Sequence, residues 1–194
     1  MVRDLPAGTV TLLFTDIEGS TLLLRELGEA YLTALSEHRA ILREAFARHG
    51  GVEVSTKGDA FFVAFRSASE AVAAAAEAQT DLRPGRIWVR MGLHTGEPFI
   101  SDDDYVGLDV HLAARIAASA HGGQVVLSAR TRDLVAQDIH LVDLGRHTLK
   151  DFDDPVQLFQ FGHERFPPLR TFPTQPYPGR AAFSLAGSAR FPKS

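Results

Sequence analysis

Residues 9–15 constrain the fold of this chain more than any other segment, because they are apolar and β-branched on both faces. A strand of this kind is typical of the centre of a sheet. It ends at Asp16, and a short polar turn containing Gly19 leads from there into a helical pattern. Asp16 is therefore predicted at the carboxyl end of a central strand, which is where α/β folds place their ligand sites.

The remaining sequence alternates between helical and strand patterns. Helices are predicted at residues 22–49 with a break at Gly28, at 68–82, at 107–119 and at 128–135. Strands are predicted at residues 52–56, 60–65, 86–94, 124–127, 140–149 and 156–161, with an interruption at 95–98 and a loop at 102–104. This order predicts an α/β fold (α+β, ferredoxin-like) with a central, mostly antiparallel sheet and helices packed on it.

Length and composition predict one domain and exclude several classes of function. Residues 1–162 are predicted to form the domain, and the Pro-rich residues 163–194 a tail or a linker to a further regulatory domain. The formal net charge of −4 argues against a nucleic-acid partner, and the lack of cysteine excludes disulfides and thiolate catalysis. The sequence contains no apolar leader and no membrane-length apolar segment, so we expect a cytoplasmic protein with no membrane partner.

Two aspartates are candidate metal ligands. Asp16 follows the central strand, and Asp59 follows Gly58 in the turn of the predicted hairpin. If the two strands are neighbours, both carboxylates reach one site, and paired oxygen ligands suit Mg²⁺ or Mn²⁺ bound to substrate phosphates. Each residue also has an ordinary structural explanation, since aspartate caps helices and favours turns.

Four segments resemble, in the same order, the catalytic domain of class III adenylyl and guanylyl cyclases. They are residues 13–21, 55–61, 90–97 and 104–116, and the resemblance extends over residues 8–161. It implies an adenylate cyclase that converts ATP into 3′,5′-cyclic AMP and pyrophosphate by two-metal-ion catalysis. Such catalysis depends mainly on positioning and on neutralising phosphate charge.

The resemblance also implies roles for individual residues. Asp16, Asp59 and the carbonyl of Ile17 would bind two Mg²⁺ or Mn²⁺ ions. The groups that would hold the phosphates are Gly19, Ser20, Thr21, Arg90 and Lys150. Arg115 would stabilise charge on the transferring phosphate, because a guanidinium stays protonated and presents several donors. The three cationic side chains also fit ordinary surface positions, where arginine and lysine form ion pairs or contact solvent.

One departure from the family pattern concerns the base. Ser55 stands where adenine-selective members carry lysine, whereas Asp104 matches their second base-binding residue. The implied preference for adenine therefore rests on Asp104, whose carboxylate can accept a hydrogen bond from the amino group of adenine. Asp102 or Asp103 takes this role if the alignment is shifted. Lys57 is two residues beyond Ser55, and its side chain is expected on the other face of the strand.

A second departure is His111, which stands where the family has a ribose-orienting asparagine and predicts reduced or pH-sensitive turnover. The family site lies between two subunits, so we expect a head-to-tail homodimer with two composite sites. One alternative is an ATP-binding sensor with weak or no turnover, which Ser55 and His111 favour. The others are a guanylyl cyclase and a metal-dependent phosphodiesterase or nuclease.

Overall fold

A seven-stranded sheet organises the computed structural model, which describes residues 4–136 and 138–171. Its strands are β1 (Val10–Ile17), β2 (Val52–Lys57), β3 (Ala60–Phe65), β4 (Val89–Gly96), β7 (Val125–Ser128), β8 (Leu141–His147) and β9 (Val156–Phe161). They lie in the order β2-β3-β1-β4-β7-β9-β8, and of these pairs only β4–β7 is parallel. The predicted mostly antiparallel sheet of an α+β fold is therefore confirmed.

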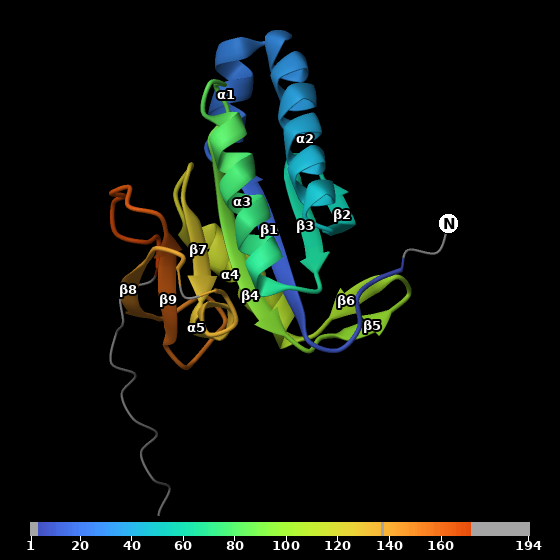
Figure 1. The fold of residues 1–194 in the computed structure, drawn as a ribbon. Helices are drawn as coiled ribbons and strands as arrows, with labels where there is room; N and C mark the ends of the chain where they lie inside the picture. The colour runs from blue at the N-terminus through green and yellow to red at the C-terminus, as the bar shows by residue number, and fades with distance from the viewer. Residues whose placement is uncertain (1–3, 137, 172–194) are drawn as a thin grey trace, which may run out of the picture.

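Helices cover both faces of this sheet. They are α1 (Ser20–Leu27), α2 (Ala30–Arg48), α3 (Ala68–Leu82), α4 (Leu108–Ser119) and α5 (Ala129–Arg132). Figure 1 shows α2 and α3 side by side on one face and α4 behind the sheet. None of the helices in the described part of the chain is both long enough and apolar enough to cross a membrane.

The alternation of β1 explains why both faces are covered. Leu13 and Ile17 pack into the core formed with α2 and α3. Val10 and Leu12 point the other way and pack in the cluster that contains Ala113 of α4. Alternate residues of a strand point to opposite faces, so a strand that is apolar throughout needs helices on both sides.

Three elements differ from the prediction. Strand β4 continues through Thr95 and Gly96, because these residues pair with β1. Residues 99–106 form a hairpin of β5 (Phe99–Ser101) and β6 (Asp104–Val106), where only a loop was expected. Asp102 and Asp103 make its turn with positive φ angles, which aspartate tolerates better than most residues. Helix α5 ends at Arg132, earlier than predicted.

Helix α4 lies very close to β4 at Gly92. A Cβ added there would lie 2.1 Å from the backbone nitrogen of Ala117 and 2.5 Å from its Cα. Gly92→Ala is therefore expected to lower the free energy of unfolding by about 3 kcal/mol, measured by urea denaturation. The clash is with backbone, so adding Ala117→Gly does not relieve it. A double variant as stable as the wild type would contradict this packing.

Candidate functional site

The structure brings Asp16 and Asp59 together at one end of the sheet. β1 and β3 pair antiparallel with Phe14 opposite Phe62, so two residues further along, Asp16 lies beside the turn that carries Asp59. Both carboxylates lie close enough to Tyr31 of α2 to affect the pKa of its phenol. Burial raises the pKa of Tyr31, and the negative charges of Asp59 and Asp16 raise it further.

Asp59 carries a buried oxygen without a partner. Its Oδ2 accepts no hydrogen bond from the described residues. An unpaired buried carboxylate oxygen is costly, and buried charges in proteins are normally paired or bind metal. Asp59, Asp16 and the carbonyl of Ile17 form an all-oxygen donor set, which fits Mg²⁺ or Mn²⁺. The described residues contain no group of three or more histidine, cysteine or acidic side chains placed for a metal.

Arg90 is the cation next to this pair. It lies opposite Asp16 in the β1–β4 register, and its Nε donates to Asp16 Oδ2 at 3.0 Å. Its Nη2 donates to the same oxygen, and its Nη1 donates to the carbonyl of Ala118 at 3.2 Å. The predicted phosphate ligand Arg90 therefore lies at the predicted metal site, where charge-assisted bonds tie it to Asp16.

The first turn of α1 follows the same strand end. Gly19 is the N-cap residue, with a φ of 67°, and it has no side chain that could cap the helix. The first N–H groups of a helix have no partner inside the helix, and they favour phosphate. Ser20 and Thr21, the predicted phosphate-binding residues, therefore begin a helix just after the end of β1 that carries Asp16 and Ile17.

The predicted base-binding residues, Ser55 and Asp104, line a cavity. Ser55, Lys57 and Asp104 all border one cavity of about 210 Å³. The expectation that Lys57 points to the other face was wrong, because residues two apart on a strand share a face. The Oδ1 of Asp104 accepts a hydrogen bond from the backbone N–H of Tyr105 at 2.7 Å.

Aromatic rings form the wall of this cavity. The rings of Phe14 and Phe62 stack with centroids 4.2 Å apart, and Phe62 meets Tyr105 edge-on at 6.0 Å. The Tyr105 hydroxyl donates to the carbonyl of Pro6, which fixes the phenol in the wall. An apolar aromatic wall with a few polar groups at its rim suits a planar base.

Arg115, His111 and Lys150 form a third group. Arg115 Nη2 donates to Asp151 Oδ2 at 2.5 Å, so the ordinary ion pair considered for this arginine is present. Lys150 precedes Asp151 and is exposed, and His111 is exposed one helical turn before Arg115. No hydrogen bond or ion pair among residues 4–136 and 138–171 connects these three side chains with Asp16 or Asp59.

The sequence did not predict a role for two residues of α2 near the predicted metal ligands. Tyr31 is buried beside both aspartates, and Arg39 Nη2 donates to the carbonyl of Gly58, in the turn that holds Asp59. Arg39 Nε is buried and has no hydrogen-bond partner among the described residues. Nothing in the amphipathic pattern of this helix distinguishes them, because their proximity to Asp59 arises only when α2 packs over β3.

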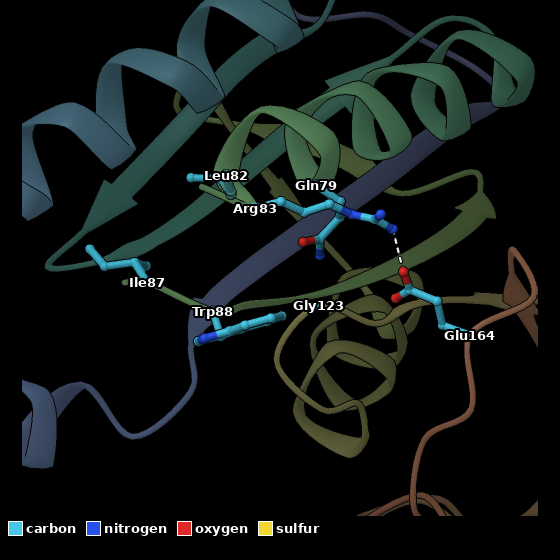
Figure 2. Close-up of a pocket in the computed structure, with 7 residues that line it drawn as sticks. All are labelled: Gln79, Leu82, Arg83, Ile87, Trp88, Gly123 and Glu164. Carbon is cyan, nitrogen blue, oxygen red and sulfur yellow. Dashed lines mark hydrogen bonds and ion pairs between the residues drawn. The ribbon is translucent and has the colours of Figure 1, made fainter. Parts of the chain in front are cut away.

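Figure 2 shows a different cavity, of about 280 Å³, on the α3 side of the sheet. Its two charged side chains, Arg83 and Glu164, form an ion pair with each other. Leu82, Ile87 and Trp88 are its apolar lining side chains, and none of the predicted site residues borders it. With its charges mutually neutralised, this cavity offers little attraction for a metal–polyphosphate complex.

Solved structures with the same fold are nucleotide cyclases. An adenylate cyclase of Trypanosoma brucei, described in its monomeric state, superposes with a TM-score of 0.80 at 26% identity and covers 87% of this chain and 96% of its own. An adenylyl cyclase of Pseudomonas aeruginosa superposes with a TM-score of 0.67 at 28% identity, covering 81% and 95%.

Sequence relatives give the same result. An uncharacterized protein of Mycobacterium tuberculosis is 46% identical over 182 residues, which span 88% of this chain and 63% of that protein. A receptor-type adenylate cyclase of Leishmania donovani is 32% identical over 93% of this chain and 17% of its own length. The chain thus spans less than two thirds of these relatives. The model for the adenylate and guanylate cyclase catalytic domain matches residues 2–162. This chain therefore belongs to the adenylate and guanylate cyclase catalytic domain family.

Proposed function

We propose that this domain is an adenylate cyclase that converts ATP into 3′,5′-cyclic AMP and pyrophosphate in the cytoplasm, with two Mg²⁺ or Mn²⁺ ions per site. The observation that carries the proposal is the convergence of Asp16 and Asp59, with the Asp59 Oδ2 buried and unpaired. When bound, the ions neutralise triphosphate charge and acidify the attacking hydroxyl group.

The residues of the chain position the substrate for this reaction. Asp16, Asp59 and the Ile17 carbonyl hold the ions, and the first turn of α1 binds phosphate oxygens through backbone N–H groups. The ribose 3′ hydroxyl group releases its proton to water, and its oxygen attacks the α-phosphorus while the bond from that phosphorus to the bridging oxygen breaks, so pyrophosphate leaves with the electron pair. Arg115 and Lys150 would stabilise the charge that develops on the phosphates.

Adenine selection is supported by the cavity at Asp104. Its carboxylate and the Ser55 hydroxyl lie around an aromatic wall of suitable shape, and Lys57 adds a cation that the family pattern places two residues earlier. A carboxylate accepts from the amino group of adenine, whereas guanine presents a carbonyl at that position and would be repelled. The Leishmania relative is also described as an adenylate cyclase.

A head-to-tail homodimer accounts for the separation of the groups. The hairpin β5–β6 projects from the domain (Figure 1), and exposed apolar side chains lie on it and at the start of α4. Phe99 is 78% exposed and Leu108 76% exposed, and Ile100 and Val106 are also exposed. Phe99 and Val106 lie opposite each other in the hairpin and share a face, and exposed apolar side chains that cluster on a surface often mark an interface. In the dimer, Asp16 and Asp59 of one subunit would face the base cavity and Arg115 of the other.

The proposed domain boundaries are residues 1–162 for the catalytic domain and 163–194 for a Pro-rich tail or linker. The described beginning of that segment packs on the domain: Leu169 is buried in the cluster with Ile116, and Arg170 N donates to the carbonyl of Ser119 at 2.8 Å. The rest of the predicted tail lies outside the described residues.

The test is product analysis with ATP and, separately, GTP, each with Mg²⁺ and then Mn²⁺. We expect cyclic AMP from ATP, little cyclic GMP, and a loss of at least about 10²-fold in Asp16→Ala, since a metal ligand is removed. Cyclic GMP as the main product would contradict adenine selection. Metal-dependent ATP binding without a cyclic product would favour the second candidate, an ATP sensor. Ser55, His111 and the pairing of Arg115 with Asp151 are the observations that favour it.

A further inference from the structure

We propose that Asp109, through a buried hydrogen-bond chain, positions α4 and its two site residues, His111 and Arg115. This hydrogen-bond chain runs from α4 into the sheet. Its members, in order, are Asp109, His94, Ser128, Thr131, Thr95 and Thr11. None of these residues belongs to the site described above. The expected effect on catalysis rests on the proposed cyclase activity. The geometry of the hydrogen bonds does not depend on it.

The contacts at Asp109 fix the first turn of α4 on the end of β4. His94 Nε2 lies 3.0 Å from Asp109 Oδ1, and the backbone N–H of Glu97 donates to Asp109 Oδ2 at 2.9 Å. A Cβ at Gly96 would lie 2.1 Å from the Asp109 Cγ, so glycine is required for the carboxyl group to approach β4 this closely. Both carboxylate oxygens are therefore held by the strand.

Helical spacing transmits this constraint to the site residues. Asp109, Ala113 and Ala117 recur every four residues and face the sheet, where both alanines are buried. His111 and Arg115 lie on the opposite face of the same helix, away from β4. Because a helix moves as a rigid element, a shift at Asp109 displaces both side chains together.

The direction of each hydrogen bond in the chain follows from one constraint. A carboxylate only accepts, so His94 Nε2 must carry a hydrogen and donate to Asp109. Burial lowers the pKa of His94, although Asp109 acts in the opposite direction, and this favours the neutral imidazole. With its hydrogen on Nε2, a neutral imidazole accepts at Nδ1 from the Ser128 hydroxyl, which lies 2.8 Å away.

The hydroxyl groups continue the same order. Ser128, having donated, accepts from Thr131 Oγ1 at 3.2 Å. Thr131 then accepts from Thr95 at 3.1 Å, and Thr95 accepts from Thr11 at 2.9 Å. One proton per hydroxyl satisfies every link from β1 to α4. Fully satisfied buried networks of this kind rigidify their surroundings.

The positioning of α4 matters because catalysis depends on small displacements. A misplacement of about 1 Å lowers turnover by about 10²-fold in enzymes that depend on orientation. Asp109→Ala removes both carboxylate contacts, so we expect kcat to fall by about ten- to a hundred-fold while KM for metal–ATP changes by less than about threefold. Amides of α4 should also exchange with solvent faster, whether or not the protein turns over ATP.

Asp109→Asn distinguishes positioning from general loss of structure. The asparagine oxygen is needed by the Glu97 N–H, so its NH₂ group must donate to His94 Nε2, which then cannot carry a hydrogen. We therefore expect the Nε2–H tautomer of His94 in the wild type and the Nδ1–H tautomer in Asp109→Asn, measured by nitrogen-15 NMR. Asp109→Asn should also retain most of the turnover that Asp109→Ala loses.

The control is Asp133→Ala, which removes an exposed carboxylate paired with Arg132 outside the site. It should leave kcat, His94 and α4 exchange unchanged. The proposal is overturned if wild-type His94 carries its hydrogen on Nδ1, or if kcat per folded protein and α4 exchange are unchanged in Asp109→Ala. If the wild type makes no cyclic product, the proposed function fails, but the tautomer and the exchange rates still decide the positioning role.

Discussion

Asp59→Asn is expected to abolish turnover while leaving the protein at least as stable as the wild type without metal. The carboxylate oxygen Oδ2 is buried and accepts no hydrogen bond from the described residues, so a neutral amide removes a charged group that lacks a donor there. We expect a loss of cyclic AMP formation of about 10³-fold, as for removal of a main charge-stabilising group. The free energy of unfolding without metal should rise by about 1 kcal/mol.

Metal-dependent stabilisation provides the second readout for Asp59. A ligand that binds only the folded state at about 100 times its Kd raises the free energy of unfolding by about 2.7 kcal/mol. We expect Mn²⁺ to stabilise the folded wild-type protein in this way and to have little effect on Asp59→Asn. Thermal denaturation with and without the ion measures the difference. Asp133→Asn, which changes an exposed carboxylate, should behave as the wild type. Full Mn²⁺ stabilisation in Asp59→Asn would remove Asp59 from the metal site.

The parts of the fold that the sequence predicted are those with strong local signals. Residues 9–15 are apolar on both faces, and they form the strand with helices on each side. Gly28 marks the break between α1 and α2, and Ser67 caps α3 by accepting from the N–H of Glu70 at 3.3 Å. Such signals depend on neighbours in sequence, so they can be recognised without the tertiary structure.

Features that depend on packing were not predictable in this way. The β5–β6 hairpin consists of three-residue strands joined by Asp102 and Asp103, without the glycine that usually marks a hairpin turn. The shared cavity of Ser55 and Asp104 requires β2 and β6 to lie near each other, which no local pattern encodes. Tyr31 lies beside Asp16 and Asp59, the predicted metal ligands, only because α2 packs there.

The hydrogen-bond chain that links Thr11 to Asp109 was even less predictable from local sequence. Its hydroxyl groups and His94 come from β1, β4, β7 and α5, and each alone has the ordinary character of a polar residue in or next to a strand. With α4, which carries Asp109, five elements must assemble before the order of donors and acceptors exists. Local sequence therefore predicts which residues carry chemistry more readily than it predicts which residues hold them in place.

His38 is expected to make the protein acid-sensitive. It is 2% exposed on α2, its two ring nitrogens have no hydrogen-bond partner among the described residues, and Phe61 meets the ring edge-on. Burial, with a smaller contribution from the positive charge of Arg39, lowers the pKa of His38 to about 4, from an ordinary value of 6.5. The folded state therefore binds this proton less readily than the unfolded state.

The pH window and the size of this effect follow from the two pKa values. Neutral His38 contributes fully to the free energy of unfolding above pH 6.5. This contribution is lost as the pH falls from 6.5 toward 4, and the total loss is about 3 kcal/mol. Other charges near the ring are Glu37, Asp81 and Arg86, which line a cavity of about 50 Å³ next to His38.

His38→Leu isolates this contribution, because the substitution removes both unpaired ring nitrogens and leaves an apolar side chain of similar size. We expect it to be as stable as the wild type or more stable at pH 7, and to lose about 3 kcal/mol less than the wild type between pH 6.5 and 4. Urea denaturation at several pH values measures both curves. The pKa of buried His94 is also lowered, but it affects both proteins equally and cancels in the difference. Parallel curves would show that His38 is protonated in the folded protein as readily as in the unfolded chain.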